Sequence, residues 1–151
     1  MKAKDIMSTT VLAVQDTDQA IHAVQIMADN DIGGLPVVNE TEVLVGIVTE
    51  QDLLLLEETE VPRVKAALYG LWIEPSRMVE ENAKRRGLLV RDVMTKKVIT
   101  FSPDTPVIEV AQTMHSRRIG RVPILEDGRV VGIIARSDVM RAIAEGKTLS
   151  E

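Results

Sequence analysis

The sequence predicts an α/β fold of the α+β type, built from two β-α-β-β-α repeats with a helical insert between them. Two observations carry this prediction: an internal duplication, and apolar patterns that switch between strand and helix periods. The stretch GIVTEQD at 46–52 returns as GIIARSD at 132–138, and DIMSTTVLAV at 5–14 matches DVMTKKVITF at 92–101. A match over so many positions indicates a repeat, and one such unit alone would bury too little apolar surface to be stable.

The expected boundaries follow the duplication, with repeat 1 at 1–56, the insert at 57–87, repeat 2 at 88–151, and both repeats in one module. The chain is 45% apolar but has one Trp, one Tyr and one Phe, so its core must be aliphatic. A net charge of −5 argues against nucleic acid as the main partner, because phosphate binding needs a basic surface. Without cysteine, a signal-peptide pattern or a membrane-length apolar run, the sequence predicts a cytoplasmic protein that does not enter membranes.

Each repeat opens with a short β-prone run, VLAV at 11–14 and VITF at 98–101, and a helix follows. Thr105 before Pro106 is typical of a helix start, because a hydroxyl can cap the first turn and the proline needs no N–H there. Asp18 takes the capping place in repeat 1. The helices carry matching apolar stripes, formed by Ala20, Val24 and Met27 in the first and by Val107, Ala111 and Met114 in the second.

Two strands and a second helix complete each repeat. LPVV at 35–38 and VGIV at 45–48 read as paired strands, as do VPIL at 122–125 and VGII at 131–134. Asp127-Gly128 between the latter two is a strong hairpin signal. The second helix of each repeat is expected to begin at the duplicated motif.

The segment at 57–87 is too long for an ordinary connection. Pro62 and Pro75 interrupt it, and its last part reads as a helix that ends at Gly87. It holds the aromatic pair Tyr69 and Trp72, which suits either a helix packed over the sheets or a surface that binds a partner or a second copy.

The duplicated motif has a structural and a functional interpretation. Thr49 followed by Asp52 is a capping box at a helix start. In repeat 2, Ala135 cannot cap through its side chain, and yet Asp138 is present. A carboxylate retained without its reciprocal partner suggests a further role.

The position of this aspartate at a helix start suits the binding of a nucleoside. A helix N-terminus presents free N–H groups and a positive dipole end, and a carboxylate beside it can accept both hydroxyls of a ribose. The small residues in IGG at 32–34 and IGR at 119–121 let a flat ring approach the backbone, with phosphate directed towards Arg121 and the helix start.

With both repeats compared, the sequence resembles a tandem pair of CBS domains, a Bateman module. The resemblance rests on DIMS, IGGLPVV and VGIVTEQDLL in repeat 1 and on DVMT, IGRVPIL and VGIIARSDVM in repeat 2. It implies repeats packed about a pseudo-twofold axis, a dimer of two modules, and two clefts that bind AMP, ADP, ATP or S-adenosylmethionine. In each cleft one repeat supplies the ribose-binding acid and the other supplies the adenine contacts.

Carried over by position, the resemblance assigns the residues of both clefts. The first cleft would contain Thr49, Asp52, Thr105, Ile119 and Gly120. The second would contain Ser137, Asp138, Asp18, Ile32 and Gly33.

We expect the two clefts to be unequal. The Asp138 cleft should have Arg121 on its phosphate side and Arg136 at its helix start, where the other has Gly34 and Glu50. A guanidinium can hold two phosphate oxygens, so the Asp138 cleft should bind phosphorylated ligands more tightly.

The sequence therefore predicts a regulatory sensor module that binds an adenine nucleotide, forms a homodimer and acts on a regulated protein it does not identify. We expect no catalysis, metal site or cofactor, because no pair of residues has the spacing of a known catalytic constellation. Two alternatives are a ligand-independent adaptor that acts through the insert, and a module that binds S-adenosylmethionine. A small nucleotide hydrolase would lack a base, a metal site and a phosphate loop.

Overall fold

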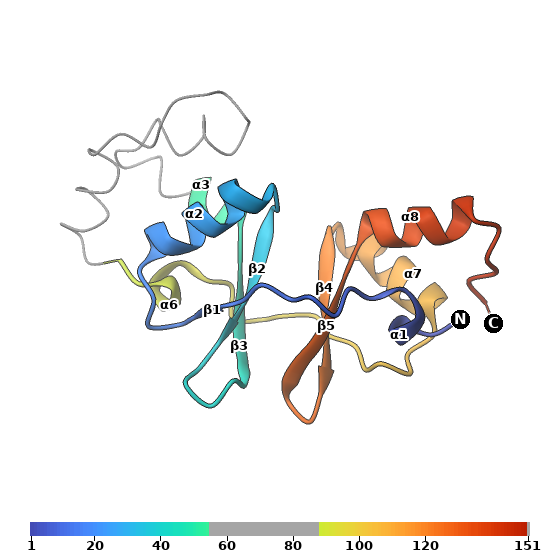
Figure 1. Cartoon of the computed structure of the whole chain (residues 1–151), viewed down its shortest axis with the longest axis horizontal. Helices are drawn as coiled ribbons and strands as arrows, with labels where there is room; N and C mark the ends of the chain where they lie inside the picture. Colours follow the sequence, from blue (N-terminus) through green and yellow to red (C-terminus); the bar gives the residue numbers. More distant parts are fainter. Residues whose placement is uncertain (55–87, 151) are drawn as a thin grey trace. The chain divides into compact units, whose positions relative to one another are not determined.

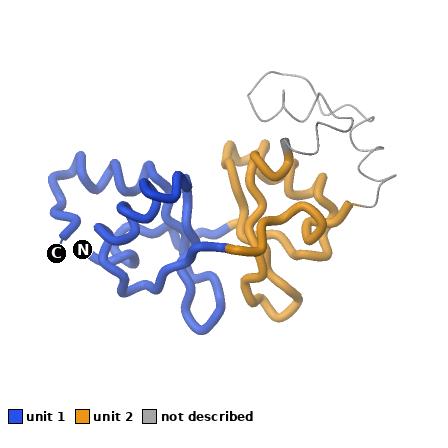
Figure 2. The backbone as a smooth tube through the Cα atoms, turned by 180° about the vertical axis from the view of Figure 1, so that it is seen from behind, with its two compact units in different colours: residues 1–11, 98–151 blue, residues 12–97 orange. Residues whose placement is uncertain are grey.

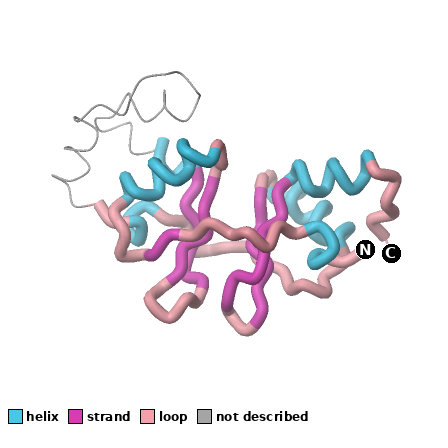
Figure 3. Tube along the Cα trace, viewed as in Figure 1, coloured by secondary structure: helices cyan, strands magenta, loops and turns pink. Residues whose placement is uncertain are grey.

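The computed structural model describes residues 1–54 and 88–150, which form two compact units (Figure 1, Figure 2). Unit 1 consists of Met1–Val11 with Val98–Glu151, and unit 2 of Leu12–Lys97. Each unit contains a small sheet with helices, which confirms the α+β class (Figure 3). The predicted helical insert at 57–87, with Tyr69 and Trp72, lies outside the described residues.

Unit 2 follows the predicted order of strand, helix, strand, strand and helix. Its elements are β1 (Val14–Gln15), α2 (Ala20–Asn30), β2 (Gly34–Val38), β3 (Leu44–Thr49), α3 (Glu50–Leu54) and α6 (Val90–Val93). β1 pairs in parallel with β2, and β2 pairs antiparallel with β3. The last element, α6, comes from the start of repeat 2.

Unit 1 repeats this plan. Its elements are α1 (Ala3–Ile6), α7 (Val107–Arg117), β4 (Arg121–Glu126), β5 (Arg129–Ala135) and α8 (Arg136–Ala144). Phe101 bridges in parallel to Ile124, where unit 2 has the pairing of β1 with β2. Asp127 and Gly128 form the predicted two-residue hairpin turn, with φ angles of 52° and 77°.

The first residues of the two repeats are exchanged between the units. We call residues 1–11 leader 1 and residues 88–97 leader 2; leader 1 packs with the body of repeat 2, and leader 2 with the body of repeat 1. Ser8 makes two backbone hydrogen bonds with Ile133, at 2.9 and 3.0 Å, and Thr95 makes two with Ile47, at 2.8 and 2.9 Å. The compact units therefore differ from the sequence repeats.

The leaders also satisfy the starts of the long helices. The N–H of Val107 donates to the carbonyl of Met1 at 3.0 Å, and the N–H of Ala20 donates to the carbonyl of Leu88 at 2.9 Å. These bonds replace side-chain caps, since the first N–H groups of a helix have no partner within it.

The capping roles predicted for Thr105 and Asp18 are wrong. The helices begin later, with Pro106 and Gln19 at the N-cap positions, and neither has a side-chain cap bond. Thr105 Oγ1 instead accepts the N–H of Ser102 at 3.1 Å, and Asp18 Oδ2 accepts the N–H of Gln15 at 2.8 Å. Both side chains therefore close the turn that precedes the helix.

The strands predicted at 11–14 and 98–101 are shorter than expected. Only Val14 of the first run lies in a strand, and only Phe101 of the second makes a bridge. The chain passes between the units in these runs, after Val11 and before Val98, so most of their residues have no sheet neighbour.

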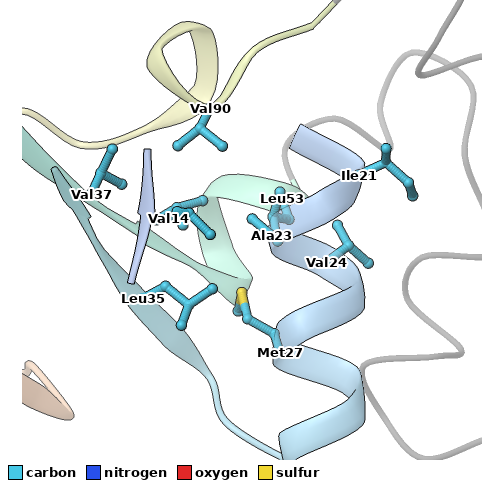
Figure 4. Close-up of a cluster of buried hydrophobic side chains, with 10 residues drawn as sticks. Val14, Ile21, Ala23, Val24, Met27, Leu35, Val37, Leu53 and Val90 are labelled. Atoms are coloured by element: carbon cyan, nitrogen blue, oxygen red, sulfur yellow. The ribbon is translucent and has the colours of Figure 1, made fainter. Parts of the chain in front are cut away.

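Each unit has its own aliphatic core, as the composition predicted. In unit 2, Met27 of α2 and Leu35 of β2 are buried together with Leu53 of α3 (Figure 4). The fully buried Val90 of leader 2 joins this core, and the fully buried Ala3 of leader 1 joins that of unit 1. Each leader therefore contributes to the hydrophobic core of its unit and is not a surface extension.

Candidate functional site

The duplicated aspartates lie in the first turn of a helix that directly follows a strand, Asp52 in α3 and Asp138 in α8. Asp138 Oδ2 accepts the backbone N–H of Ala135 at 2.8 Å, and Asp52 Oδ2 accepts the backbone N–H of Thr49 at 2.9 Å. Because this bond uses a main-chain donor, it needs no hydroxyl at the position of Thr49 or Ala135. The structure thus explains why the aspartate recurs in the second motif and the threonine does not.

The second carboxylate oxygen distinguishes the two aspartates. Asp52 Oδ1 accepts the hydroxyl of Thr95, from leader 2, at 2.9 Å, and Thr49 Oγ1 also donates to Asp52 Oδ2 at 3.1 Å. Asp138 Oδ1 has only a long contact of 3.5 Å from Arg141 Nη1 among the bonds found in the described residues, and the side chain is 16% exposed. Asp138 therefore has more acceptor capacity available to a ligand.

The residues around Asp138 in unit 1 lie at the start of β4 and at the end of β5. The N–H of Arg136 donates to the carbonyl of Gly120 at 3.0 Å, and Arg136 Nε donates to the carbonyl of Ile119 at 3.2 Å. Arg121 pairs with Ala135 in the β4–β5 register. Within one unit, the structure therefore brings IGR at 119–121 to the start of α8.

Unit 2 has the same arrangement with different side chains. The N–H of Glu50 donates to the carbonyl of Gly33 at 3.0 Å, and Gly34 pairs with Thr49 in the β2–β3 register. Ile32 and Gly33 therefore lie with Thr49 at the start of α3. The predicted clefts combine residues of unit 1 with residues of unit 2, and that combination stays a prediction.

Thr105 and Asp18 lie apart from these helix starts within their own units. Thr105 precedes α7 and Ile119 follows it, and a helix of 11 residues spans about 16 Å. Asp18 likewise precedes α2, and Ile32 follows it.

Ser137, in contrast, lies at one of these helix starts. It is exposed on the first turn of α8, next to Asp138.

Sequence reasoning missed the leader residues that contact the duplicated motif. Thr95 donates to Asp52, and the side chain of Met94 packs against Gly46. In unit 1, Met7 packs against Gly132. The signal was present in the sequence, because a methionine followed by a hydroxyl residue occupies the same place in DIMS and DVMT.

The fold and the duplicated helix starts agree with comparisons to known proteins. The family model described as "CBS domain" matches residues 3–58 and 90–145. The chain belongs to the CBS domain family and contains a tandem pair of these domains.

Two relatives come from Methanocaldococcus jannaschii. The uncharacterized protein MJ1426 is 31% identical over 160 residues, which cover 95% of this chain and 91% of the relative. Inosine-5′-monophosphate dehydrogenase is 31% identical over 141 residues, which cover 93% of this chain but only 23% of the enzyme.

Among solved structures, the CBS domain pair of protein MJ0100 is similar over 97% of this chain and 98% of its own, with a TM-score of 0.74 and 27% identity. That structure holds 5′-methylthioadenosine and S-adenosyl-L-methionine. Within residues 1–54 and 88–150 of the present chain, none of the helices has both the length and the apolar character to cross a membrane.

Proposed function

We propose that this chain is a regulatory module that binds an adenosine-containing ligand without catalysis and works as a homodimer. The availability of Asp138 is the observation that carries the proposal. One of its oxygens is fixed by the Ala135 N–H at 2.8 Å, which orients the carboxylate. The other oxygen has the long ion pair with Arg141 at 3.5 Å and can accept a ribose hydroxyl. The adenosyl ligands in the related MJ0100 pair support the same ligand class.

The proposal gives a role to the predicted residues, with Arg136 at the helix start beside Asp138 as a second cation for a phosphate. Asp138 accepts the ribose hydroxyls, with Ser137 beside it, and Arg121 holds a phosphate when the ligand carries one. Ile32 and Gly33 contact the adenine, and Asp18 lies near this ligand. In the other site, Asp52 and Thr49 take the ribose, and Thr105, Ile119 and Gly120 complete the site.

The absence of catalysis is part of the proposal. The similarity to inosine-5′-monophosphate dehydrogenase covers 23% of that enzyme, so the shared part is a module of the CBS type. A regulatory module needs only a ligand whose binding favours one state of the protein.

Isothermal titration calorimetry tests the proposal with adenosine, AMP, ADP, ATP, 5′-methylthioadenosine and S-adenosylmethionine. We expect an adenine nucleotide to bind best, with S-adenosylmethionine as the alternative. Asp138→Asn keeps an acceptor for the Ala135 N–H but removes the charge, so it should weaken binding by about 1.5–3 kcal/mol, or roughly tenfold to a hundredfold.

Asp92→Asn is the matched control. Asp92 Oδ2 accepts the N–H of Leu89 at 2.8 Å in the same way, but it lies in the leader helix α6, outside the proposed sites. Affinity should be unchanged in this variant. Absence of binding heat with all six compounds, or equal affinity of Asp138→Asn and wild type, would refute the proposal.

A further inference from the structure

Methionine is the only sulfur-containing residue type in this chain, which has seven methionines and no cysteine. A methionine thioether can take one oxygen atom from a peroxide, and the sulfoxide that forms is polar where the thioether was apolar. The surroundings of each methionine therefore decide where such a modification would change the structure.

Three kinds of surroundings occur among the internal methionines of the described residues. Met27 and Met114 are buried in the cores of the two units. Met140 is 62% exposed on α8, so an added oxygen there would meet water. Met7 and Met94, one in each leader, are partly buried and pack against the core of their unit.

The two leader methionines place their sulfur against a glycine. A Cβ atom at Gly46 would stand 2.6 Å from Met94 Sδ and 3.0 Å from the carbonyl oxygen of Thr95. A Cβ atom at Gly132 would likewise overlap with Met7 Sδ. Both glycines are buried in their strands, so the sulfur fills the space that a side chain would take.

A sulfoxide does not suit this contact. The atoms nearest to the missing Cβ of Gly46 are those of Met94 itself and the carbonyl oxygen of Thr95. A sulfoxide oxygen is a hydrogen-bond acceptor, and a second acceptor cannot satisfy it. The oxygen also needs volume, which a contact this close does not leave. Oxidation at these positions should therefore push the leader away from the strand.

The bonds that hold each leader lie directly beside its methionine. Thr95 exchanges two backbone hydrogen bonds with Ile47, at 2.8 and 2.9 Å, and its hydroxyl donates to Asp52 Oδ1 at 2.9 Å. Ser8 exchanges two backbone hydrogen bonds with Ile133, at 2.9 and 3.0 Å. Movement of the methionine would break these bonds with it.

We propose that Met7 and Met94 are modification sites at which oxidation by a peroxide releases the leaders. The sulfur lone pair attacks one peroxide oxygen, the O–O bond breaks, and the other oxygen leaves with both protons as water when the oxidant is hydrogen peroxide. The sulfur loses the two electrons that the peroxide gains. Both side chains are partly exposed, which gives a small peroxide access from solvent.

Treatment of the full chain with increasing hydrogen peroxide tests the modification, with peptide mass spectrometry to locate each sulfoxide. We expect sulfoxide at the exposed Met140 first, then at Met7 and Met94, and last at the buried Met27 and Met114.

Amide hydrogen exchange tests the release of the leaders. The N–H groups of Ser8, Ile47, Thr95 and Ile133 make the bonds between leader and strand. In protein oxidised at both leader methionines, these amides should exchange at least about tenfold faster than in untreated protein, because local opening exposes them.

The variant M7L/M94L tests the cause. Leucine is close to methionine in volume and cannot form a sulfoxide, so the variant should fold and keep its leaders in place. Met140→Leu is the matched control, because it removes an oxidisable methionine outside the leaders. After the same peroxide treatment, Tm should fall by at least about 4 °C in wild type and in Met140→Leu, and stay nearly constant in M7L/M94L.

The single variants Met7→Leu and Met94→Leu keep the test decisive if the double variant does not fold. In each of them, peroxide should speed exchange only at the leader that still has its methionine. Leader methionines that resist peroxide while the protein is folded would overturn the inference. Sulfoxides at both sites with unchanged amide exchange, or an equal fall in Tm in M7L/M94L, would overturn it as well.

Discussion

The sulfur of Met94 lies against Gly46, where a Cβ atom would stand only 2.6 Å from it. Met94 belongs to leader 2, and Gly46 lies in β3 of repeat 1. The same relationship joins Met7 of leader 1 to Gly132 of repeat 2. The glycine that opens both duplicated motifs therefore makes room for a leader methionine.

Gly46→Ala should destabilise the protein. The new methyl would meet the Met94 sulfur at 2.6 Å and the backbone carbonyl of Thr95 at 3.0 Å, and overpacking of this kind typically costs about 1–3 kcal/mol. Urea denaturation measures the loss. Gly120→Ala is the matched control, because a Cβ there has no neighbour within 4 Å, and its stability should stay close to wild type.

A double-mutant cycle tests the cause. If the methionine is responsible, the cost of Gly46→Ala should shrink in a Met94→Ala background, since residues in contact give non-additive effects. Equal costs in both backgrounds would show that the clash lies elsewhere.

Removing the carboxylates should destabilise the two helix starts unequally. Asp138→Ala loses the bond from the Ala135 N–H, which should cost about 0.5–1.5 kcal/mol, and a long, exposed ion pair with Arg141 that adds little. Asp52→Ala also loses the bonds from the hydroxyls of Thr49 and Thr95, so its cost should be larger. Chemical denaturation measures both, and an equal or smaller loss for Asp52→Ala would contradict the prediction.

Arg121→Ala should weaken the binding of AMP much more than the binding of adenosine. The guanidinium can form parallel hydrogen bonds with a phosphate, and adenosine has none. Titration calorimetry of both ligands should show one strong AMP site lost, because the equivalent residue in repeat 1 is Gly34. Two equal AMP sites in wild type, or equal losses for both ligands, would contradict the predicted inequality.

Asp104 joins leader 1 to the rest of unit 1 through ion pairs with Lys4 at 2.8 Å and Lys2 at 3.0 Å. Hydrogen bonds from Lys4 and then Lys2 lower the pKa of the Asp104 carboxyl below its ordinary value of 3.8. The bond to Asp104 raises the pKa of Lys4 above 10.5. The stabilisation should therefore be complete at neutral pH, fade as pH falls through the lowered pKa of Asp104, and fade as pH rises through the raised pKa of Lys4.

Asp104→Asn provides the comparison. Its Tm should be slightly below that of wild type at pH 7 and low salt, and the difference should vanish in acid. High salt should also reduce it, because all three side chains are at least half exposed and salt screens such pairs. If the difference in Tm changed with neither pH nor salt concentration, its cause would be something other than charge.

Much of the fold was predictable because its signals are local. Apolar periodicity predicted α2 and α7, and Asp127-Gly128 predicted the β4–β5 turn. The caps predicted at Thr105 and Asp18 failed for a tertiary reason, since leader carbonyls from Met1 and Leu88 take the helix N–H groups.

Only the part of the candidate site that lies within one repeat was predictable from the sequence. The duplicated motif identified Asp52 and Asp138 and placed them at helix starts. It did not reveal that Thr95 occupies one oxygen of Asp52, because that contact joins residues that are 43 positions apart.

The sequence by itself determined the duplication, the element order and the aliphatic composition of the core, because these follow from residue spacing along the chain. Only the tertiary structure decided that each leader packs with the body of the other repeat. Gly46 and Gly132 occupy equivalent positions, so residue spacing alone does not predict which of them Met7 contacts and which Met94 contacts. That choice depends on the complete packing of each unit, in which Ala3 and Val90 are buried in separate cores.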